Sequence, residues 1–292
     1  MIEVKIAVAQ MMLTVLMFAT GAAFGSLLGV LIDRLPRGIG LWTPRSFCLH
    51  CHTQLAWYDL LPVISYGFLR GRCRTCRTRI APNLLFLELL CGVLLCLLVA
   101  RWGNSLCTIQ LFVLCWLLLG IAHVDAQTGW IPLHLLVVLW VSGLGFGAFS
   151  YLEQYGTADC VLSASLLQRI VASFGALIVL GMVLVASTKI LQYIKRIGPQ
   201  QSAMGWGDPL LLAGIAAYMG LFWLPIIVFL ASLQSILFHL FYRATNRSWI
   251  LKKWHQEKPE EQLAKHAIPF APFLAAATWQ TVALALMWPT QL

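Results

Sequence analysis

The sequence predicts an all-α polytopic membrane protein with about eight transmembrane helices and a loop domain after the first helix. Of the 292 residues, 60% are hydrophobic and only 11% are charged, whereas charged residues make up about 25% of an average soluble domain. The mean hydropathy is +0.81. The apolar residues also gather in runs long enough to cross a hydrocarbon core of about 30 Å.

Counting the apolar runs in order predicts eight spans. The first run is too long for the apolar core of a signal peptide, so we expect it to remain as a helix. Residues 209–242 are too many for one crossing, and Pro225 lies among aromatic residues where a turn is expected, which divides this stretch in two. The spans are expected at residues 7–32, 84–100, 106–124, 131–152, 169–188, 208–221, 223–242 and 268–288.

Basic residues are divided unevenly between the two sides of this bundle. With the N-terminus outside, seventeen of the twenty Lys and Arg residues fall on the inside, and only Lys5, Arg101 and Arg169 fall outside. Such an excess is typical of cytoplasmic loops, so the even number of spans and the outside N-terminus support each other. The net charge of +9 is then explained mostly by the basic residues of these cytoplasmic loops. The sequence contains no basic surface interleaved with aromatic residues, so nucleic-acid binding is not predicted.

The longest loop, residues 33–83, is named here the tetracysteine loop because it carries Cys48, Cys51, Cys73 and Cys76 in two Cys-x-x-Cys pairs. Each pair can present two thiolates to one ion, so the pattern predicts a tetrahedral site for structural zinc. Iron and a pair of disulfides are the alternatives, and cytoplasmic thiols usually stay reduced. The neighbouring His50 and His52 could each replace a ligand.

Two aspartates lie at the inside ends of predicted spans: Asp125 ends the third and Asp208 begins the sixth. Ionisable residues at membrane depth are costly and are functional candidates. If the two carboxyl groups approach each other, one can act as a base and the other as an acid, as in an aspartic protease. Structural roles stay open, with Asp208 as a helix N-cap before Pro209 and Asp125 in a polar turn.

Several segments together resemble the bacterial type IV prepilin peptidases, membrane aspartic proteases with a GxGD motif that remove the leader from type IV prepilins and pseudopilins. Besides the four cysteines, the segments are "GAAFGSLLGVLIDRLP" at 21–36, "LPVISYGFLRGRCRTC" at 61–76, "NLLFLELLCG" at 83–92, "VDAQTGWIP" at 124–132, "MGWGDPLLLAG" at 204–214 and "IPFAPFLAAA" at 268–277. They follow the family's order from end to end. We accordingly expect a first helix at 1–32, a zinc-binding loop domain at 33–83 and a membrane aspartic peptidase domain at 84–292.

The resemblance implies that Asp125 and Asp208 are the catalytic pair, in a site that opens to the cytoplasmic face of the bacterial inner membrane. It also implies a second activity, methylation of the new N-terminal residue with S-adenosylmethionine, for which the sequence locates no pocket. Gly205 and Gly207 are expected to support the site, because glycine lets a backbone come close. Glu88 is the acid expected to have a supporting role, with a snorkelling carboxylate at a helix end as the alternative.

Three positions depart from the family pattern. Leu133 stands where an Asp is usual, Ala271 stands where a Gly usually separates Phe and Pro, and Pro209 directly follows the GxGD acid. One alternative is therefore a catalytically impaired scaffold for pilus or type II secretion assembly. A proton-coupled transporter is less favoured, because both acids lie at one surface and no internal repeat is visible. The expected partners are prepilin or pseudopilin substrates and the lipid bilayer.

Overall fold

The computed structural model describes residues 2–40, 45–152, 165–194, 205–245 and 269–287. These ranges are helical apart from turns and short loops, and their only β pairing consists of two isolated bridges. The predicted all-α class is therefore confirmed. The chain divides into two compact units, Met1–Trp116 and Leu117–Leu292, which are described separately.

The first unit is built on a pair of long helices. Helix α1 (Ile2–Arg34) packs along α3 (Pro82–Trp102), and the loop between them holds the short helices η1 (Leu35–Arg37), η2 (Trp57–Leu60) and α2 (Ile64–Phe68). Helix α4 (Leu106–Thr128) begins in this unit. Its Trp116 donates an indole N–H hydrogen bond to the carbonyl of Phe24 in α1, 2.8 Å away.

Glycines let α1 and α3 approach each other closely. Gly21, Gly25 and Gly29 recur every four residues on α1. A Cβ atom on Gly21 would lie 2.5 Å from the Cys91 carbonyl oxygen, and one on Gly25 would lie 2.6 Å from the Leu87 carbonyl oxygen. This is the small-residue contact that membrane helices use to bring their backbones together.

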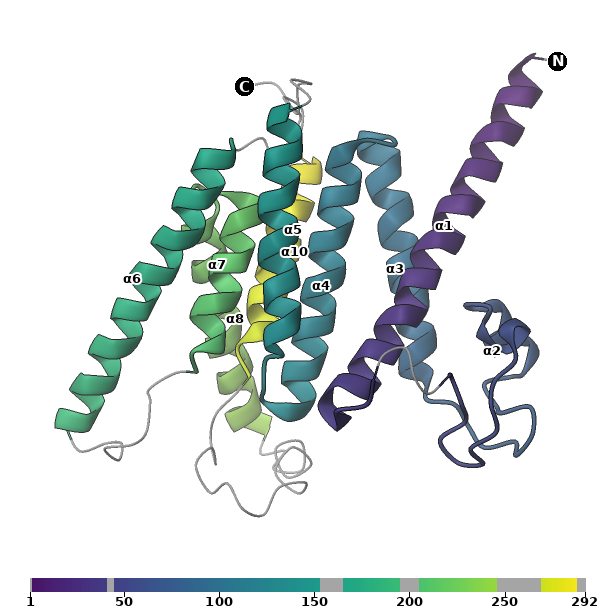
Figure 1. Cartoon of the computed structure of the whole chain (residues 1–292), viewed down its shortest axis with the longest axis horizontal. Helices are drawn as coiled ribbons and strands as arrows, with labels where there is room; N and C mark the ends of the chain where they lie inside the picture. The colour runs from purple at the N-terminus through teal and green to yellow at the C-terminus, as the bar shows by residue number, and fades with distance from the viewer. Residues whose placement is uncertain (1, 41–44, 153–164, 195–204, 246–268, 288–292) are drawn as a thin grey trace. The chain divides into compact units, whose positions relative to one another are not determined.

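The second unit surrounds a short buried helix, α7 (Gly207–Met219). Helix α7 packs against α5 (Leu133–Leu152) and α6 (Leu166–Tyr193), and it also touches α8 (Leu224–Thr245) and α10 (Ala271–Met287), which pack on each other. Most residues of α7 are buried. The indole N–H of Trp140 in α5 donates to the Leu210 carbonyl in α7, 3.0 Å away. Helix α7 is therefore the core element of this unit (Figure 1).

Each of the eight predicted spans coincides with a helix, and the predicted division near Pro225 is confirmed, because α7 ends at Met219 and α8 begins at Leu224. Within the described ranges, the helices long and apolar enough to cross a membrane are Val4–Arg37, Pro82–Trp102, Leu106–Thr128, Leu166–Ile190 and Leu224–Phe241. The apolar helices Leu133–Phe149 and Gly207–Met219 are shorter. The protein is thus a multi-pass membrane protein, with five helices long enough to span, and the count of eight spans stays a prediction.

The structure bears on only some of the basic residues that were used to predict the orientation. The basic residues expected inside at 195–196 and 247–265 lie outside the described residues. Arg169, the first residue of the span expected at 169–188 and counted on the outside, lies in the first turn of α6 and is only 1% exposed. The helix begins earlier than its apolar run, because Ser165 and Gln168 form a capping box in front of Arg169.

Candidate active site and metal centre

The four cysteines of the tetracysteine loop converge on one point. Their sulfur atoms all lie within 4.8 Å of one another, and Cys48 Sγ is 3.8 Å from Cys76 Sγ. Four sulfurs placed tetrahedrally about 2.3 Å from a zinc ion are separated by about 3.8 Å, so the cluster fits that ion. All four cysteines are free thiols, contrary to the disulfide alternative. Neither His50 nor His52 belongs to the cluster.

The convergence arises because the loop contains the same turn twice, 25 positions apart. The Cys48 N–H donates to the Thr53 carbonyl and the Cys73 N–H donates to the Thr78 carbonyl, at 3.0 and 2.9 Å. The residue after each second cysteine has a positive φ, 56° at His52 and 59° at Arg77. Each knuckle is therefore a local structure that turns its two sulfurs the same way, and the loop needs only to bring two knuckles together.

A threonine hydroxyl follows the second cysteine of each knuckle. Cys51 is hydrogen bonded to Thr53 Oγ1 and Cys76 to Thr78 Oγ1, both at 3.3 Å. The Thr78 contact lowers the pKa of the Cys76 thiol to about 6, and the Thr53 contact lowers the pKa of Cys51 in the same direction. Because metals bind the thiolate form, both contacts favour a ligand set that is ready for a cation.

Asp125 lies in the last turn of α4 and is 5% exposed. Its Oδ2 accepts a hydrogen bond of 3.2 Å from the backbone N–H of Ala271, the first residue of α10. The helix continues to Thr128, and the left-handed Gly129 ends it by donating its N–H to the Asp125 carbonyl at 2.7 Å. The interpretation of Asp125 as part of a polar turn is therefore wrong, because its backbone is helical and its side chain makes a tertiary contact.

Asp208 lies in the first turn of α7 and is half-buried. The N-cap position belongs to Trp206 and has no side-chain cap hydrogen bond, so the interpretation of Asp208 as an N-cap is also wrong. Its carboxyl group is close enough to Asp125 for the two to interact electrostatically. The fold thus brings together two acids that 82 residues separate in the sequence. Carboxyl groups that interact in this way can divide the roles of acid and base.

The two motif glycines differ in their surroundings. A Cβ atom on Gly207 would lie 2.9 Å from Cδ1 of Ile131, so glycine lets the start of α7 approach the segment between α4 and α5. A Cβ atom on Gly205 would meet only the Gly207 nitrogen, at 4.0 Å. Packing therefore explains Gly207, whereas Gly205 has no close neighbour among the described residues.

The structure also shows where the three residues that depart from the family pattern lie. Ala271 contacts Asp125 through its backbone N–H, a donor that alanine and glycine share. Leu133 is the first residue of α5 and is 59% exposed. Pro209 is buried in the first turn of α7, where a helix tolerates proline because the first N–H groups have no intrahelical partner.

Glu88 lies in the second turn of α3 and is 5% exposed. Its Oε2 accepts a hydrogen bond of 2.7 Å from the backbone N–H of Val63, which has a left-handed φ of 61°. It also interacts with the Ser26 side chain of α1. The alternative of a snorkelling carboxylate is therefore wrong, because Glu88 is buried and ties the tetracysteine loop to both long helices of the first unit.

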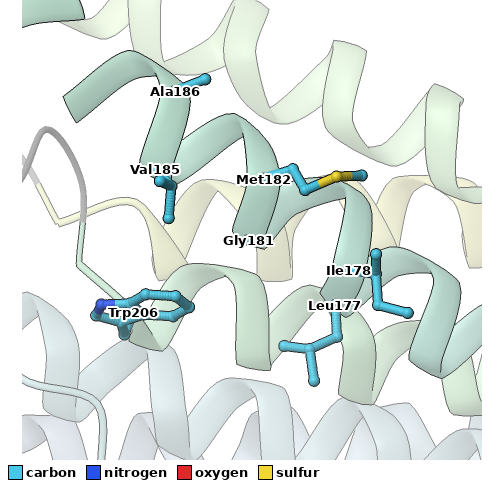
Figure 2. A pocket seen from close by; sticks show the side chains of 7 residues that line it. All are labelled: Leu177, Ile178, Gly181, Met182, Val185, Ala186 and Trp206. Atoms are coloured by element: carbon cyan, nitrogen blue, oxygen red, sulfur yellow. The ribbon is translucent and has the colours of Figure 1, made fainter. Parts of the chain in front are cut away.

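A shallow apolar groove of about 440 Å³ lies beside the GxGD motif. Figure 2 shows the Trp206 ring facing the side chains of α6 across this groove. The lining contains no charged side chain and therefore supplies no acid or base. Its residues are Leu177, Ile178, Gly181, Met182, Val185, Ala186 and Trp206.

Two family models match the chain. The bacterial peptidase A24 N-terminal domain matches residues 19–102, which include the four cysteines and Glu88, and the type IV leader peptidase family matches residues 112–240, which include both aspartates. No solved structure gives a significant match.

Several relatives carry the same name, prepilin leader peptidase/N-methyltransferase. One from Burkholderia pseudomallei (strain 1026b) is 34% identical over 244 residues, 84% of this chain and 68% of the relative. One from Klebsiella pneumoniae is 33% identical over 222 residues, 74% of this chain and 89% of the relative. One from Aeromonas hydrophila is 27% identical over 297 residues, 94% of this chain and 90% of the relative. With both domain models matched in order and identity above 30% across most of a relative, the chain belongs to the type IV leader peptidase family.

Proposed function

We propose that the protein removes the leader peptide of type IV prepilins or pseudopilins, with Asp125 and Asp208 as its catalytic pair. The observation that carries this proposal is the interaction between two carboxyl groups from α4 and α7. Neither acid serves the structural role that its sequence neighbourhood suggested. Both also fall within the match to the type IV leader peptidase family, and the relatives' name supports the same activity.

The geometry suggests how the two acids divide the work. The Ala271 N–H donates to Asp125 and so favours a negative charge there, which makes Asp125 the base that takes a proton from water. The water oxygen attacks the carbonyl carbon of the scissile peptide bond. Asp208 donates a proton to the leaving nitrogen, and the C–N bond breaks to give a carboxyl group and a free amine. The substrate must be locally extended, because a helical peptide bond is shielded from water.

A second activity is proposed for the freed N-terminus. The relatives' name includes N-methyltransferase, and S-adenosylmethionine is the methyl donor that fits such a reaction. The acceptor must be a neutral amine, which exists only after cleavage, so cleavage comes first. When bound, the donor would supply a methyl group from its sulfonium, and the amine would lose one proton in exchange.

We propose structural zinc for the tetracysteine loop, bound by Cys48, Cys51, Cys73 and Cys76. The spacing of the sulfurs and the hydrogen bonds that favour thiolates support this choice. The metal would cross-link two knuckles, each of which is flanked by one isolated β bridge of its own. The division into a first helix at 1–32, a zinc-binding domain at 33–83 and a peptidase domain at 84–292 accompanies this proposal.

The proposed location is the bacterial inner membrane, with the N-terminus outside and the active site facing the cytoplasm. Eight of the basic residues fall in the segment from Arg34 to Arg79, as expected for a cytoplasmic loop. A cytoplasmic location would also keep the four thiols reduced for a metal. Prepilins or pseudopilins and the surrounding lipid are the partners that follow.

The test is co-expression with candidate prepilins in cells that lack their own peptidase, followed by mass spectrometry of the mature N-terminus. A shortened product with one additional methyl group would support both activities. Asp125→Asn and Asp208→Asn should leave the precursor uncut while inserting normally. Intact cleavage in both single variants would contradict the proposed catalytic pair. An uncut precursor across several candidates, with inserted wild-type protein, would favour the scaffold instead.

A further inference from the structure

Arg169 is a charged residue buried within the membrane helices of the second unit. Its side chain is 1% exposed and belongs to the largest fully buried side chains among the described residues. A charged group inside a membrane bundle is expensive and is kept where it does something specific. The catalytic proposal above assigns no role to this residue.

The guanidinium of Arg169 joins three helices. From α6, its Nη1 donates to the Gly143 carbonyl of α5 at 3.4 Å and to the Ala217 carbonyl of α7 at 3.3 Å. These helices are neighbours in the fold (Figure 1). A guanidinium is planar, permanently charged and rich in donors, which suits it to hold two backbone carbonyls at once.

Helix α5 provides space for this contact through its glycines. A Cβ atom on Gly147 would lie 2.6 Å from Cδ of Arg169. A Cβ atom on Gly143 would lie 2.8 Å from the Tyr218 ring. The Tyr218 hydroxyl lies 2.7 Å from Ser142 Oγ, to which it donates a hydrogen bond. The C-terminal end of α7 is therefore fastened to α5 and α6 by a polar cluster.

Helix α7 needs such a fastening because it is short. Its 13 residues span about 20 Å, less than a hydrocarbon core of about 30 Å. The last carbonyls of a helix have no partner within it, and an unpaired carbonyl in hydrocarbon is costly. The Gly220 N–H donates to the Ala216 carbonyl at 2.9 Å. The Arg169 guanidinium donates to the next carbonyl, that of Ala217. A positive charge at this end also complements the helix dipole.

Asp208 lies in the first turn of the same helix. Nine positions separate Asp208 from Ala217 along one continuous helix, and the intervening turns are largely buried. We infer that Arg169 is a positioning residue that holds the C-terminal end of α7 and thereby sets how closely Asp208 approaches Asp125. The inference rests on the proposed catalytic pair.

The test uses the full-length protein in detergent or vesicles, with a cleavable prepilin as substrate. Arg169→Met removes the charge and the donors while keeping an unbranched side chain. We expect kcat to fall on the order of tenfold to a hundredfold, because small displacements of a catalytic group have effects of that size. We expect KM to change by less than about twofold, since Arg169 does not touch the substrate. Arg169→Lys should recover part of kcat.

A merely structural role would give a different pattern. Loss of folded enzyme scales the rate equally at every pH, whereas a displaced Asp208 changes its interaction with Asp125 and so changes the shape of the kcat profile with pH. Arg101→Met is the matched control, because Arg101 is an exposed arginine at the end of α3 in the first unit. If Arg169→Met fails to insert, Gly147→Ala keeps the charge and presses on the Arg169 side chain. Wild-type kcat and pH profile in that variant would overturn the inference.

Hydrogen exchange separates this inference from the catalytic proposal. Peptides from residues 207–219 should exchange faster in Arg169→Met, while those from α8 keep their wild-type rates, because only the fastening of α7 is lost. If the wild-type protein cleaves no prepilin, the catalytic proposal fails, and exchange still decides whether Arg169 holds α7. Unchanged exchange together with an unchanged kcat would overturn the positioning role.

Discussion

The tetracysteine loop and the aspartate pair are assembled in opposite ways. Each cysteine knuckle closes within six residues of chain, through equivalent hydrogen bonds and a residue of positive φ at the equivalent position. The loop then brings the two knuckles together. Asp125 and Asp208 come from two helices and are within electrostatic range of each other only because the second unit packs around α7. A cysteine cluster made of local turns can therefore be predicted from residue spacing, whereas two acids on separate helices come together only in the packed bundle.

The largest effect is expected from the aspartates. Asp125→Asn or Asp208→Asn should lower the initial rate of leader cleavage by at least about a thousandfold, because each removes one partner of a unit that works together. Asp33→Asn is the matched control, since Asp33 forms an exposed ion pair with Arg37, 2.9 Å away. That variant should keep wild-type activity. Full cleavage by either aspartate variant would contradict the proposed catalytic role of that aspartate.

Metal removal tests whether the two regions can be separated. Cys48→Ser combined with Cys76→Ser should lower bound zinc from about one ion per chain to near zero, as measured by elemental analysis of purified protein. The loop should become more sensitive to protease, while leader cleavage falls by less than about tenfold, because the ligands and the carboxyl groups belong to different units. Cys96→Ser, a change in α3 outside the cluster, should leave the zinc content unchanged. Cleavage lost as completely as in Asp125→Asn would show that the regions are coupled.

Gly25→Ala tests the helix pair that frames the tetracysteine loop. The new Cβ atom would lie 2.6 Å from backbone atoms of Leu87 and Glu88, so α1 and α3 would have to separate. Such overpacking costs about 1–3 kcal/mol, which should appear as a lower midpoint of thermal unfolding in detergent. Gly145→Ala is the control, because a Cβ atom there meets no other atom within 4 Å. Equal midpoints for the two variants would contradict the close contact.

The smallest effect is expected at Ala271. Ala271→Gly restores the residue usual in the family and keeps the backbone N–H that donates to Asp125, so cleavage rates should stay within about twofold of wild type. Ala271→Pro removes that donor at the first position of α10, where a helix otherwise tolerates proline. Ala271→Pro should therefore lower the cleavage rate more than Ala271→Gly does. A large gain from glycine would mean that the alanine side chain, rather than the hydrogen bond, limits the site.

The sequence predicted where the helices lie, because long apolar runs report burial in lipid directly. All eight runs became helices, although α7 is shorter than a full span. The structural roles suggested for Asp125 and Asp208 were wrong for one reason. Each depended on the residues next to the acid. Helix α4 extends one turn further, and α7 starts two residues earlier, than those neighbours indicate.

Arg169 shows the limit of counting charges. Its capping box, Ser165 with Gln168, was visible in the sequence and marks the true start of α6. A charge count placed the residue on the outside, at the first position of its span, because a count gives each basic residue a side of the membrane and says nothing of its burial. Its partners, the carbonyls of Gly143 and Ala217, are backbone groups that carry no sequence signal.

The membrane class, the helix positions and the four clustered cysteines could be predicted from the sequence, since each is a property of short segments. Only the tertiary structure decided that Asp125 accepts a hydrogen bond from Ala271, that Glu88 anchors Val63, and that Arg169 holds the end of α7. The physical reason is that these contacts join distant segments, and in two of the three the partner is a backbone N–H whose position depends on packing. A buried polar side chain must find a partner wherever the fold supplies one.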